Sequence, residues 1–589
     1  MPDSGPTVLL DSCGSGEFGP SWRFSGYAGT VQALAPDEVA AVLAKVEQAS
    51  DTGLHAVGFV AYEAAHSLNP DLPPLDGVEG MPLAWFALFL HRRPARAYEG
   101  VPVDDGTRID LVPTLDQAAH AAAVGRIREY IAAGDCYQVN YTFPMTAGFS
   151  GDPLSLYRRI CQGQKAPFSA YIDTGRFTII SASPELFFSL RSGVITARPM
   201  KGTARRGRWW SEDRKMAALL RDNPKERAEN LMIVDLIRND LGVVAKTGTV
   251  HVDSLFDLET YPTVLQMTST VSARLRSGVG VAEIFRALFP CGSVTGAPKR
   301  RAMEIIHELE PTPRGAYCGA IGYISPDREA RFSVAIRTLT LDRTVGTLTL
   351  GVGSGITWDA SAEAEYRECL DKGAFLRQEE GFDLVESLRL VQGKFSLLER
   401  HINRMAAAAA YFGFPFAAAE ARRQLAVHAA DSSGIRKVRL LLSPDGRLTV
   451  SSEELSEENI DRPLRIALAM ERVHSTDPFV FHKTTRRGFF QRARANRPDC
   501  DELLFVNERG EVTEGTYHNL VVRLDGRLFT PPVSSGLLPG TLREELLERK
   551  EIEERILSPA ELEEAEEVWL INSVRGWRRA TLMEKEECR

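Results

Sequence analysis

The stretch SAEAEYRECLDK (residues 361–372) carries acidic and basic side chains at helical spacing. Glu365, Glu368 and Lys372 fall at positions i, i+3 and i+7, which places them on one face of a helix. Two carboxylates on one face can bind a hard cation such as Mg²⁺ through their oxygen atoms. A salt-bridged surface helix has the same pattern, so these residues alone leave both interpretations open.

Three glycines precede this helix at alternate positions in TLTLGVGSGI. The pattern predicts a strand that runs into a glycine-rich turn at Gly351, Gly353 and Gly355, followed by the helix. Successive backbone N–H groups at such a turn and at a helix N-terminus suit an anionic ligand. The region therefore predicts an anion site beside a candidate cation site.

Polar side chains interrupt several apolar segments upstream. Glu229 lies in a mostly apolar helix, predicted to end at Gly242, where a carboxylate is costly unless it is paired or binds a metal. Arg337 lies in the predicted apolar strand RFSVAIRTLTL, which is typical of a buried carboxylate clamp. Glu185 stands at the start of a strand, and Ser293 lies in a Gly/Ser/Thr loop before a helix. Each could instead be a cap, a surface pair or a core salt bridge.

Two lysines have distinctive surroundings. Lys201 follows a Pro-Met pair and precedes a Gly-Thr turn, beside a patch of arginines. Lys483 lies in a polar gap after an apolar stretch, in FVFHKTTRRGFF. Glu514 follows about thirty residues later, and the turn GLLPGTLR then opens onto a helix at Thr541 and Leu542, which predicts a phosphate site. Taken alone, each lysine reads as an ordinary surface charge.

Bulk properties restrict the classes of protein. With 589 residues the chain is too long for one hydrophobic core, so at least two domains are expected. A net charge of −9 with both signs interspersed argues against a nucleic-acid or anionic-membrane partner. The eight cysteines are scattered without CxxC spacing, which suits a reducing cytosol, and we expect a cytoplasmic protein. No signal peptide and no apolar run of membrane-spanning length is expected.

Segment order predicts the domain organisation. Up to about residue 375, β-rich segments and long helices alternate in a mixed α/β (α+β) pattern rather than in regular βαβ units. A junction is predicted over 376–381, and the pattern restarts at Phe382. We therefore predict a first domain over 1–375 and a second over 382–589, the latter with a small subdomain (382–465) and a large one (466–589).

The order of motifs in the first domain closely resembles that of the chorismate-utilising enzymes. The similarity runs from about residue 118 to 372, and the stretches that carry it are GDCYQVN, ASPELF, RPMKGT, AENLMIVDLIRNDLG, GSVTGAPKRRAMEII, YCGAIGY, AIRT, GSGI and EAEYRECLDK. The resemblance implies a large sandwich of antiparallel sheets with outer helices. It also implies binding of chorismate and Mg²⁺.

The resemblance also implies roles for individual residues. Glu229 and Glu368 would ligate Mg²⁺, with Glu365 acting through water. Glu185 would be the general acid that helps the C4 hydroxyl of chorismate to leave. The substrate would be held by Ser293, Tyr317, Arg337, Lys372 and the backbone of Gly353 and Gly355.

Lys201 distinguishes branches of this family. Anthranilate and isochorismate synthases carry a small residue there, whereas aminodeoxychorismate synthases carry a lysine. An amine at chorismate C2 can add there as the C4 hydroxyl departs, after which ammonia attacks C4 and expels the enzyme amine. Gln138 stands where water-adding relatives have a lysine, which disfavours a water-adding reaction. Gln266 stands where many relatives have a histidine, which is a departure from the family pattern.

The second domain resembles the fold-type IV pyridoxal-phosphate (PLP) enzymes over about 382–580. These include branched-chain and D-amino-acid aminotransferases and aminodeoxychorismate lyase. The resemblance implies that Lys483 forms the Schiff base with PLP and that Glu514 faces the pyridine nitrogen. Arg404 would bind the phosphate, helped by the backbone at Thr541 and Leu542 and by Ser573. The motifs alone do not choose between lyase and aminotransferase, and fusion to a synthase favours the lyase.

Together the two resemblances imply p-aminobenzoate synthesis from chorismate for folate. The alternative is an anthranilate synthase fused to an aminotransferase. No cysteine lies in a glutaminase context, so a separate glutamine amidotransferase is the expected ammonia source. A homodimer through the PLP domain is a further hypothesis, because enzymes of this fold are commonly dimers.

Overall fold

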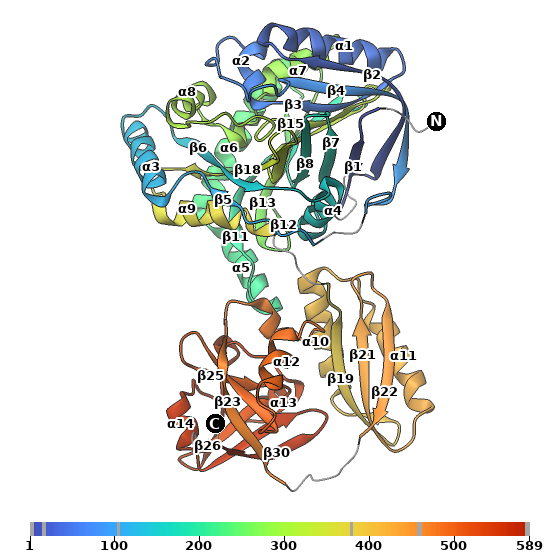
Figure 1. Cartoon of the computed structure of the whole chain (residues 1–589), viewed down its shortest axis with the longest axis vertical. Helices are drawn as coiled ribbons and strands as arrows, with labels where there is room; N and C mark the ends of the chain where they lie inside the picture. Colours follow the sequence, from blue (N-terminus) through green and yellow to red (C-terminus); the bar gives the residue numbers. More distant parts are fainter. Residues whose placement is uncertain (1–4, 15–18, 103–105, 377–380, 456–461, 584–589) are drawn as a thin grey trace. The chain divides into compact units, whose positions relative to one another are not determined.

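The computed structural model describes residues 5–14, 19–102, 106–376, 381–455 and 462–583 (Figure 1). Its internal contacts divide the chain into two units. The first comprises residues 1–205 and 217–379, and the second comprises 206–216 and 380–589. The segment Arg206–Met216 therefore belongs to the second unit, although by sequence it interrupts the first. Most of the predicted junction, 377–380, lies outside the described residues.

Antiparallel pairing joins eighteen strands of the first unit, counted over its described residues. One layer runs, in pairing order, through β12 (His251–Thr260), β13 (Val264–Arg274), β10 (Val194–Arg198), β9 (Leu186–Arg191), β16 (Ala330–Val334), β15 (Ala320–Ile324), β3 (His55–Val60), β4 (Ala84–Ala95) and β2 (Ser21–Ala33). β1 (Val8–Asp11) pairs with both β2 and β7 and so begins the other layer. That layer runs through β7 (Phe168–Asp173), β8 (Phe177–Ser183), β17 (Thr338–Asp342), β18 (Thr347–Ile356) and β6 (Gln138–Gly148).

The two layers pack face to face. Phe59 and Trp85 of the first layer share a buried cluster with Ile172 and Ile179 of the second. Alternating apolar side chains on each strand produce this core, because successive residues of a strand point to opposite faces. The predicted sandwich of antiparallel sheets is thereby confirmed.

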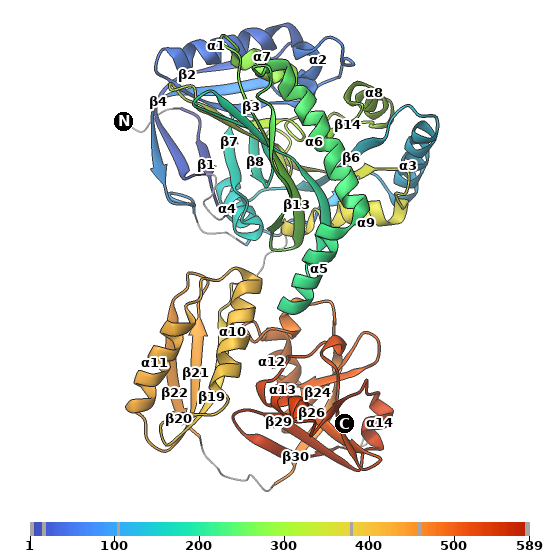
Figure 2. The same cartoon turned by 180° about the vertical axis from the view of Figure 1, so that it is seen from behind.

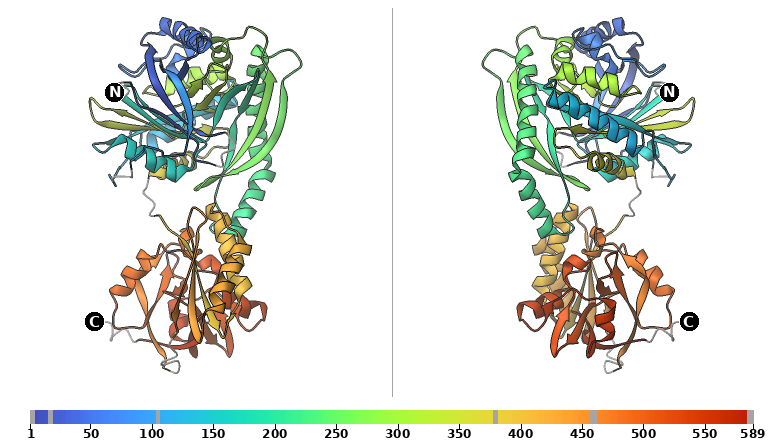
Figure 3. Two further views of the ribbon diagram at one scale, coloured as in Figure 1. Left: turned by 90° about the vertical axis from the view of Figure 1, so that its right-hand side faces the viewer. Right: turned by 90° about the vertical axis from the view of Figure 1, so that its left-hand side faces the viewer.

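Helices cover the outer faces, as predicted. α1 (Val39–Asp51), α6 (Pro224–Val244) and α7 (Val281–Leu288) pack on the first layer, and α4 (Pro153–Gln164) packs on the second. Figure 2 shows the long helix α6 crossing its sheet, and Figure 3 shows it alongside β12 and β13. Among the described residues, no helix has the length and apolar character that crossing a membrane requires.

Three local predictions were wrong. Gly242 does not end its helix: α6 continues to Val244, whose buried side chain holds the last turn in the core. Gly353 and Gly355 lie within β18, paired to Thr142 and Asn140 of β6, and do not form a turn. Arg337 lies between β16 and β17 with φ of +51°, so the predicted single strand is two strands.

The second unit contains two sheets. β20 (Lys394–Phe395), β19 (Leu384–Val391), β21 (Ile435–Leu442) and β22 (Leu448–Glu454) form the first sheet, on which α10 (Leu398–Phe412) and α11 (Ala418–Ala430) pack. The second sheet has the order β25 (Val512–Gly515), β24 (Glu502–Asn507), β23 (Leu464–Val473), β30 (Gly576–Leu582), β29 (Glu567–Asn572), β26 (Asn519–Leu524), β27 (Arg527–Thr530) and β28 (Glu553–Glu554). The backbone N–H of Val385 on β19 donates to the carbonyl of Lys483, 2.9 Å away, which links the two sheets beside that lysine.

Candidate functional sites

Lys201 lies on β11 (Met200–Arg205), which pairs with β13. Its Nζ is 3.1 Å from Oε2 of Glu229 on α6, so the amine forms an ion pair with a carboxylate. Asn230 donates to the Lys201 carbonyl at 3.0 Å, and Gln266 donates to the carbonyl of Gly202 at 3.0 Å. Gln266, the departure from the family pattern, therefore braces the strand next to the lysine.

Gln138 and Gly355 meet Lys201 from the other layer. A Cβ at position 355 would lie 2.6 Å from Lys201 Nζ and 2.7 Å from Gln138 Nε2, so any side chain there would displace these two groups from their present positions. Gln138 is 1% exposed, and neither polar atom of its amide has a hydrogen-bond partner among the described residues. Buried amides are normally satisfied, so this one points to a ligand position.

Glu185 lies between β8 and β9, close to where it was predicted. It is 2% exposed, and burial raises the pKa of its carboxyl to about 7, against the opposing hydrogen bond of Ser293. The backbone N–H of Met200 donates to its Oε1 at 3.4 Å, which ties it to the residue before Lys201. A carboxyl with this pKa can donate a proton near neutral pH.

Two helices bring carboxylates to the same part of the first unit. Glu229 lies on α6, and Glu365 and Glu368 lie on α9 (Ala362–Asp371). Burial raises the pKa of Glu365, and the charge of Glu368 adds to that shift. Burial also raises the pKa of Glu226, and the charges of Glu229 and Glu368 add to it. Glu226 was not predicted, although its i, i+3 spacing to Glu229 signals a shared helix face.

Two of these carboxylates form ion pairs with lysines. Lys372 Nζ lies 2.8 Å from Glu368. Burial raises the pKa of Glu368, but the charge and hydrogen bond of Lys372, together with the charges of Lys201 and Arg337, lower it overall. Glu229 is paired with Lys201. Within the described part of the chain, no three His, Cys, Asp or Glu side chains are grouped closely enough for a metal ion. The predicted Mg²⁺ ligands thus approach one another but do not form a closed set.

Arg337 has the features of an anion clamp. It is half-buried, burial lowers its pKa, and it forms no ion pair with any described residue. Its Nη1 donates to the side-chain oxygen of Gln164 at 3.5 Å, a long hydrogen bond. Its φ is positive, which is uncommon for a residue with a side chain and occurs at turns as well as at functional sites.

Three other residues predicted to bind substrate, Tyr317, Lys372 and Ser293, already contact other groups of the first unit. The ring of Tyr317 lies against Gly351, where a Cβ would be 2.1 Å from ring carbon Cδ1. Lys372 donates to the carbonyl of Gly353 at 2.7 Å, so its amine is already bound to backbone as well as to Glu368. Ser293 lies in a short 3-10 turn, Gly292–Val294, and donates to Cys291 Sγ at 3.2 Å.

A buried clamp behind this site was not predicted. Arg314 donates to both oxygens of Glu310 and to the carbonyls of Val294 and Asn140, at 2.7–2.8 Å. Glu63 accepts from the backbone N–H groups of Arg314 and Gly315. These bonds fix the loop that carries Ser293 and the turn that leads to Tyr317. The i, i+4 spacing of Glu310 and Arg314 was the available signal.

A cavity of about 300 Å³ in the second unit gathers most of the residues predicted there. Its lining includes the predicted Arg404, Lys483, Glu514, Thr541 and Ser573. Leu542 does not line it, and its side chain packs in a small apolar cluster instead.

Lys483 and Glu514 have strongly shifted titrations. Burial lowers the pKa of Lys483 to about 8, helped by Arg404 and opposed by Glu386. Among the described residues, nothing forms a hydrogen bond or ion pair with its amine. Burial raises the pKa of Glu514 to about 8, although the Leu538 N–H and the Asn519 amide donate to its two oxygens at 3.0 and 2.9 Å.

Arg404 is oriented by a carboxylate that was not predicted. Glu386 of β19 accepts from Nε and Nη2 of Arg404 at 2.8 and 2.6 Å, and from His401 at 2.7 Å. His401 in turn lies 3.3 Å from Thr541 Oγ1. Thr541 begins α13 (Thr541–Glu548), whose first backbone N–H groups have no partner within the helix. A guanidinium and a helix N-terminus thus meet in one cavity, which suits a phosphate.

Known families cover both units. Residues 6–378 match the family model described as chorismate binding enzyme, and residues 383–583 match the model described as amino-transferase class IV.

Curated relatives and a solved structure resemble the first unit. Aminodeoxychorismate synthase component 1 of Klebsiella aerogenes is 47% identical over 247 residues, which is 42% of this chain and 54% of that protein. Anthranilate synthase component 1 of Cereibacter sphaeroides is 37% identical over 326 residues, 52% of this chain and 65% of that protein. The crystal structure of anthranilate synthase component I from Streptococcus pneumoniae superposes with a TM-score of 0.52 at 25% identity, covering 64% of this chain and 93% of that one. The chain thus spans about half the length of the aminodeoxychorismate synthase relative that it matches.

Proposed function

Because the chain belongs to the family of chorismate binding enzymes over residues 6–378 and matches the class IV aminotransferases over 383–583, we propose that it converts chorismate to p-aminobenzoate in two steps. The observation that carries the proposal is Lys201. Its amine lies over Gly355 and beside the Gln138 amide, whose polar atoms have no hydrogen-bond partner among the described residues.

In the first step, Lys201 is the nucleophile. The amine forms a bond to C2 of chorismate, and the C4 hydroxyl leaves as water with a proton from Glu185. Ammonia then adds at C4, the C2–N bond to Lys201 breaks, and the product is 4-amino-4-deoxychorismate. Lys201 must leave its ion pair with Glu229 before it attacks, because only a neutral amine has a free electron pair.

Mg²⁺ fits the carboxylates in chemistry, since α6 and α9 supply hard oxygen donors that lie close enough for their charges to interact. We propose that Glu229 and Glu368 bind it, with Glu365 acting through water. When bound, the cation would neutralise a carboxylate of the substrate. Arg337, which has no ion pair among the described residues, is proposed to bind the other carboxylate, with Tyr317, Ser293, Lys372 and the backbone of Gly353 and Gly355 around the ring.

In the second step, Lys483 moves a proton. PLP fits the cavity because its lining includes a buried amine with no partner among the described residues, a buried carboxyl, and a guanidinium at a helix N-terminus. When bound, PLP supplies an electron sink. Lys483 would hold PLP and take the C4 proton of 4-amino-4-deoxychorismate, while the C3–O bond breaks, enolpyruvate leaves and the ring becomes aromatic. Protonation of the enolpyruvate methylene carbon then gives pyruvate. Glu514 would face the pyridine nitrogen, and Arg404, Ser573 and the backbone at Thr541 and Leu542 would hold the phosphate.

Ammonia is proposed to come from a separate glutamine amidotransferase. The names of the relatives as component 1 support a second component. We also propose a homodimer through the class IV domain, on the likeness to that family alone.

Anthranilate synthesis is the second candidate, because the anthranilate synthase relative matches over the longer stretch. The two candidates differ in product. Purified chain would be incubated with chorismate, Mg²⁺ and ammonium, with and without PLP, and the products separated by chromatography. We expect p-aminobenzoate and pyruvate with PLP, and 4-amino-4-deoxychorismate without it. Anthranilate in either mixture would refute the proposal.

A further inference from the structure

The segment Arg206–Met216 is built into the second unit. It follows β11, the strand of Lys201, and includes the start of α5 (Trp210–Asp222). By sequence it lies within the match to the chorismate binding enzymes. Its side chains nevertheless contact the region around Lys483.

Asp213 gives the segment a defined shape. Its carboxylate accepts from Nε and Nη2 of Arg206 at 2.8 Å each and from the backbone N–H of Gly207 at 2.8 Å. The side chains of Arg206 and Asp213 are 7% and 5% exposed, and a bidentate pair so well buried is strong and directional. A Cβ at Gly207 would lie 2.1 Å from the backbone nitrogen of Asp213, so this turn requires glycine.

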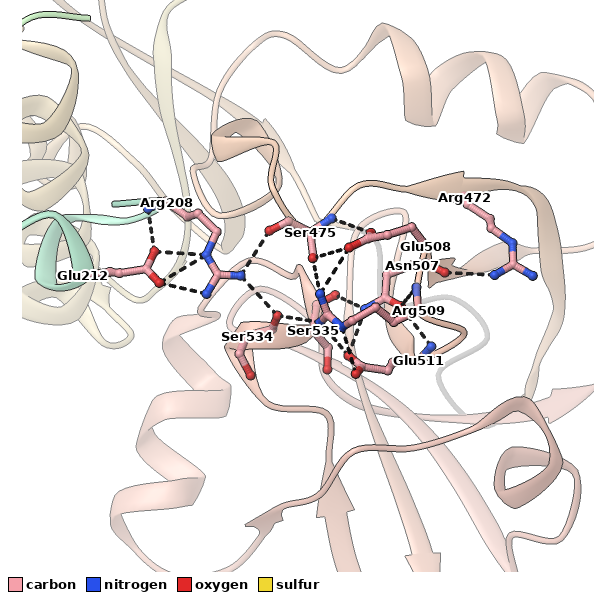
Figure 4. Close-up of polar contacts among 10 residues, drawn as sticks. All are labelled: Arg208, Glu212, Arg472, Ser475, Asn507, Glu508, Arg509, Glu511, Ser534 and Ser535. Carbon is pink, nitrogen blue, oxygen red and sulfur yellow. Dashed lines mark hydrogen bonds and ion pairs between the residues drawn. The ribbon is translucent and has the colours of Figure 1, made fainter. Parts of the chain in front are cut away.

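Arg208 anchors the segment to two loops of the second unit, as Figure 4 shows. Its guanidinium is held by Glu212 at 2.8 Å and donates to the carbonyls of Ser475 at 3.2 Å and Ser534 at 3.5 Å. Ser475 is in turn fixed by Glu508, which accepts from both its N–H and its hydroxyl.

The segment also holds His482, the residue before Lys483. The carbonyl of Arg208 lies 3.2 Å from His482 Nε2. A carbonyl can only accept, so Nε2 carries the proton in this contact. Burial lowers the pKa of His482 to about 4, with Arg206 adding to the shift and Asp213 opposing it, so the ring is neutral at physiological pH.

Aromatic packing completes the contact. The ring of Tyr411 lies 4.4 Å from that of His482, and the guanidinium of Arg206 lies 4.4 Å from the ring of Tyr411. Arg206 also donates to the Tyr411 carbonyl at 2.8 Å. Trp209 packs at 5.0 Å on Phe481, two residues before Lys483.

Lys483 is therefore fixed from both sides. Its own carbonyl accepts from the N–H of Val385 of β19. The N–H of Thr485 donates to the Asp383 carbonyl, and the N–H of Asp383 donates to the Thr485 hydroxyl. The residues before it are held by the segment. A change in the backbone at His482 would swing the long lysine side chain within its cavity.

We propose that Arg206–Met216 is a positioning element of the class IV site, which holds His482 and so sets the place and reactivity of Lys483. The inference rests on the proposed function, in which Lys483 is the lysine that holds PLP. It assigns to the second site a segment that the family matches place in the first.

The test measures Lys483 itself in the full-length chain without PLP. Lysine acylation by acetic anhydride is followed at a series of pH values, and the Lys483 peptide is quantified by mass spectrometry. The charged groups that act on this amine are Arg404, Glu386, Arg487 and Glu514, and all stay in place in the variants. The unaltered chain should show a midpoint near pH 8.

Three variants separate the outcomes. Gly207→Ala distorts the turn, His482→Leu removes the donor, and His482→Gln keeps an amide donor. If the segment positions Lys483, the first two admit water and raise the midpoint by about one pH unit, while His482→Gln stays near the unaltered value. Gly125→Ala, at an open position on α3 (Gln117–Ala132), is the matched control and should change nothing.

An unchanged midpoint in both Gly207→Ala and His482→Leu would overturn the proposal, even if their melting temperatures fall. If Gly207→Ala does not fold, His482→Leu against His482→Gln decides. The assay needs neither PLP nor substrate. If the chain forms no p-aminobenzoate, the proposed function is refuted. The acylation midpoints of the variants would still show whether the segment positions Lys483.

Discussion

Glu185 combines the properties that a proton donor needs. It is buried, its pKa is raised to about 7, and the backbone N–H of Met200 ties it to the strand that carries Lys201. Lys483 is shifted in the opposite direction by the same cause, loss of water, because its charged form is the protonated one. Burial thus prepares an acid in one unit and a base in the other.

The synthase rate should depend on the protonation of Glu185. Its pKa is raised, so the acid form predominates below pH 7 and is lost as the pH rises through about 7. We predict that kcat/KM for ammonia-dependent consumption of chorismate, corrected for the free ammonia present, falls above that pH. Glu185→Gln should lose this limb and about 100-fold or more in rate.

Glu363→Gln is the control for that substitution. Glu363 lies on α9 near the site, but its side chain is 68% exposed and pairs only with Arg367 among the described residues. A Glu185→Gln enzyme with the unaltered rate and pH profile would remove Glu185 from the mechanism.

The packing of strands determines how closely the side chains of the first site approach one another. β18 carries glycines at alternate positions because β6 and the side chains of the site crowd one of its faces. Alternate glycines in sequence fit a turn as well as a crowded strand, and only the position of β6 distinguishes them. This is why the turn prediction was wrong. The Arg191–Val194 hairpin, in contrast, follows from local sequence, because a glycine such as Gly193 readily adopts the positive φ that its tight turn requires.

Two glycines of β18 should respond differently to alanine. At Gly353 the new Cβ would meet the Tyr141 carbonyl at 2.6 Å, so we predict a loss of about 1–3 kcal/mol in the free energy of unfolding. At Gly355 it would meet the ends of the Lys201 and Gln138 side chains, which can move. Gly355→Ala should therefore keep most of its stability and lose synthase activity.

Denaturant titration and initial rates of chorismate consumption measure the two effects. Gly125→Ala, where no atom lies within 4 Å of the new Cβ, controls for the loss of a glycine as such. Full synthase activity in Gly355→Ala would show that the lysine does not need this space.

At the scale of the whole molecule, each candidate site is made of residues from one unit. The motifs were enough to predict both families and the sandwich fold. They could not predict the place of Arg206–Met216, because its partners Tyr411 and His482 lie some two hundred residues or more along the chain. The clamp of Glu63 and Arg314 was missed for the same reason, since Glu63 is 251 positions away from Arg314.

The two half reactions should be separable by substitution. We predict that Lys483→Ala still converts chorismate and ammonia to 4-amino-4-deoxychorismate but releases no pyruvate. Lys201→Ala should form pyruvate and p-aminobenzoate only when 4-amino-4-deoxychorismate is supplied. Chromatography of both reaction mixtures checks this, and loss of both half reactions in either variant would contradict two independent sites.

The most direct test of the central claim is a mass measurement on Lys201. The chain is incubated with chorismate and Mg²⁺ in the absence of ammonia, digested and analysed by peptide mass spectrometry. The account predicts that the peptide containing Lys201 gains the mass of chorismate less one water, and that Lys201→Ala gains none. The contradicting result has two parts: the Lys201 peptide stays unmodified, and the same chain forms 4-amino-4-deoxychorismate once ammonium is added. The amino group would then have reached C4 without the lysine.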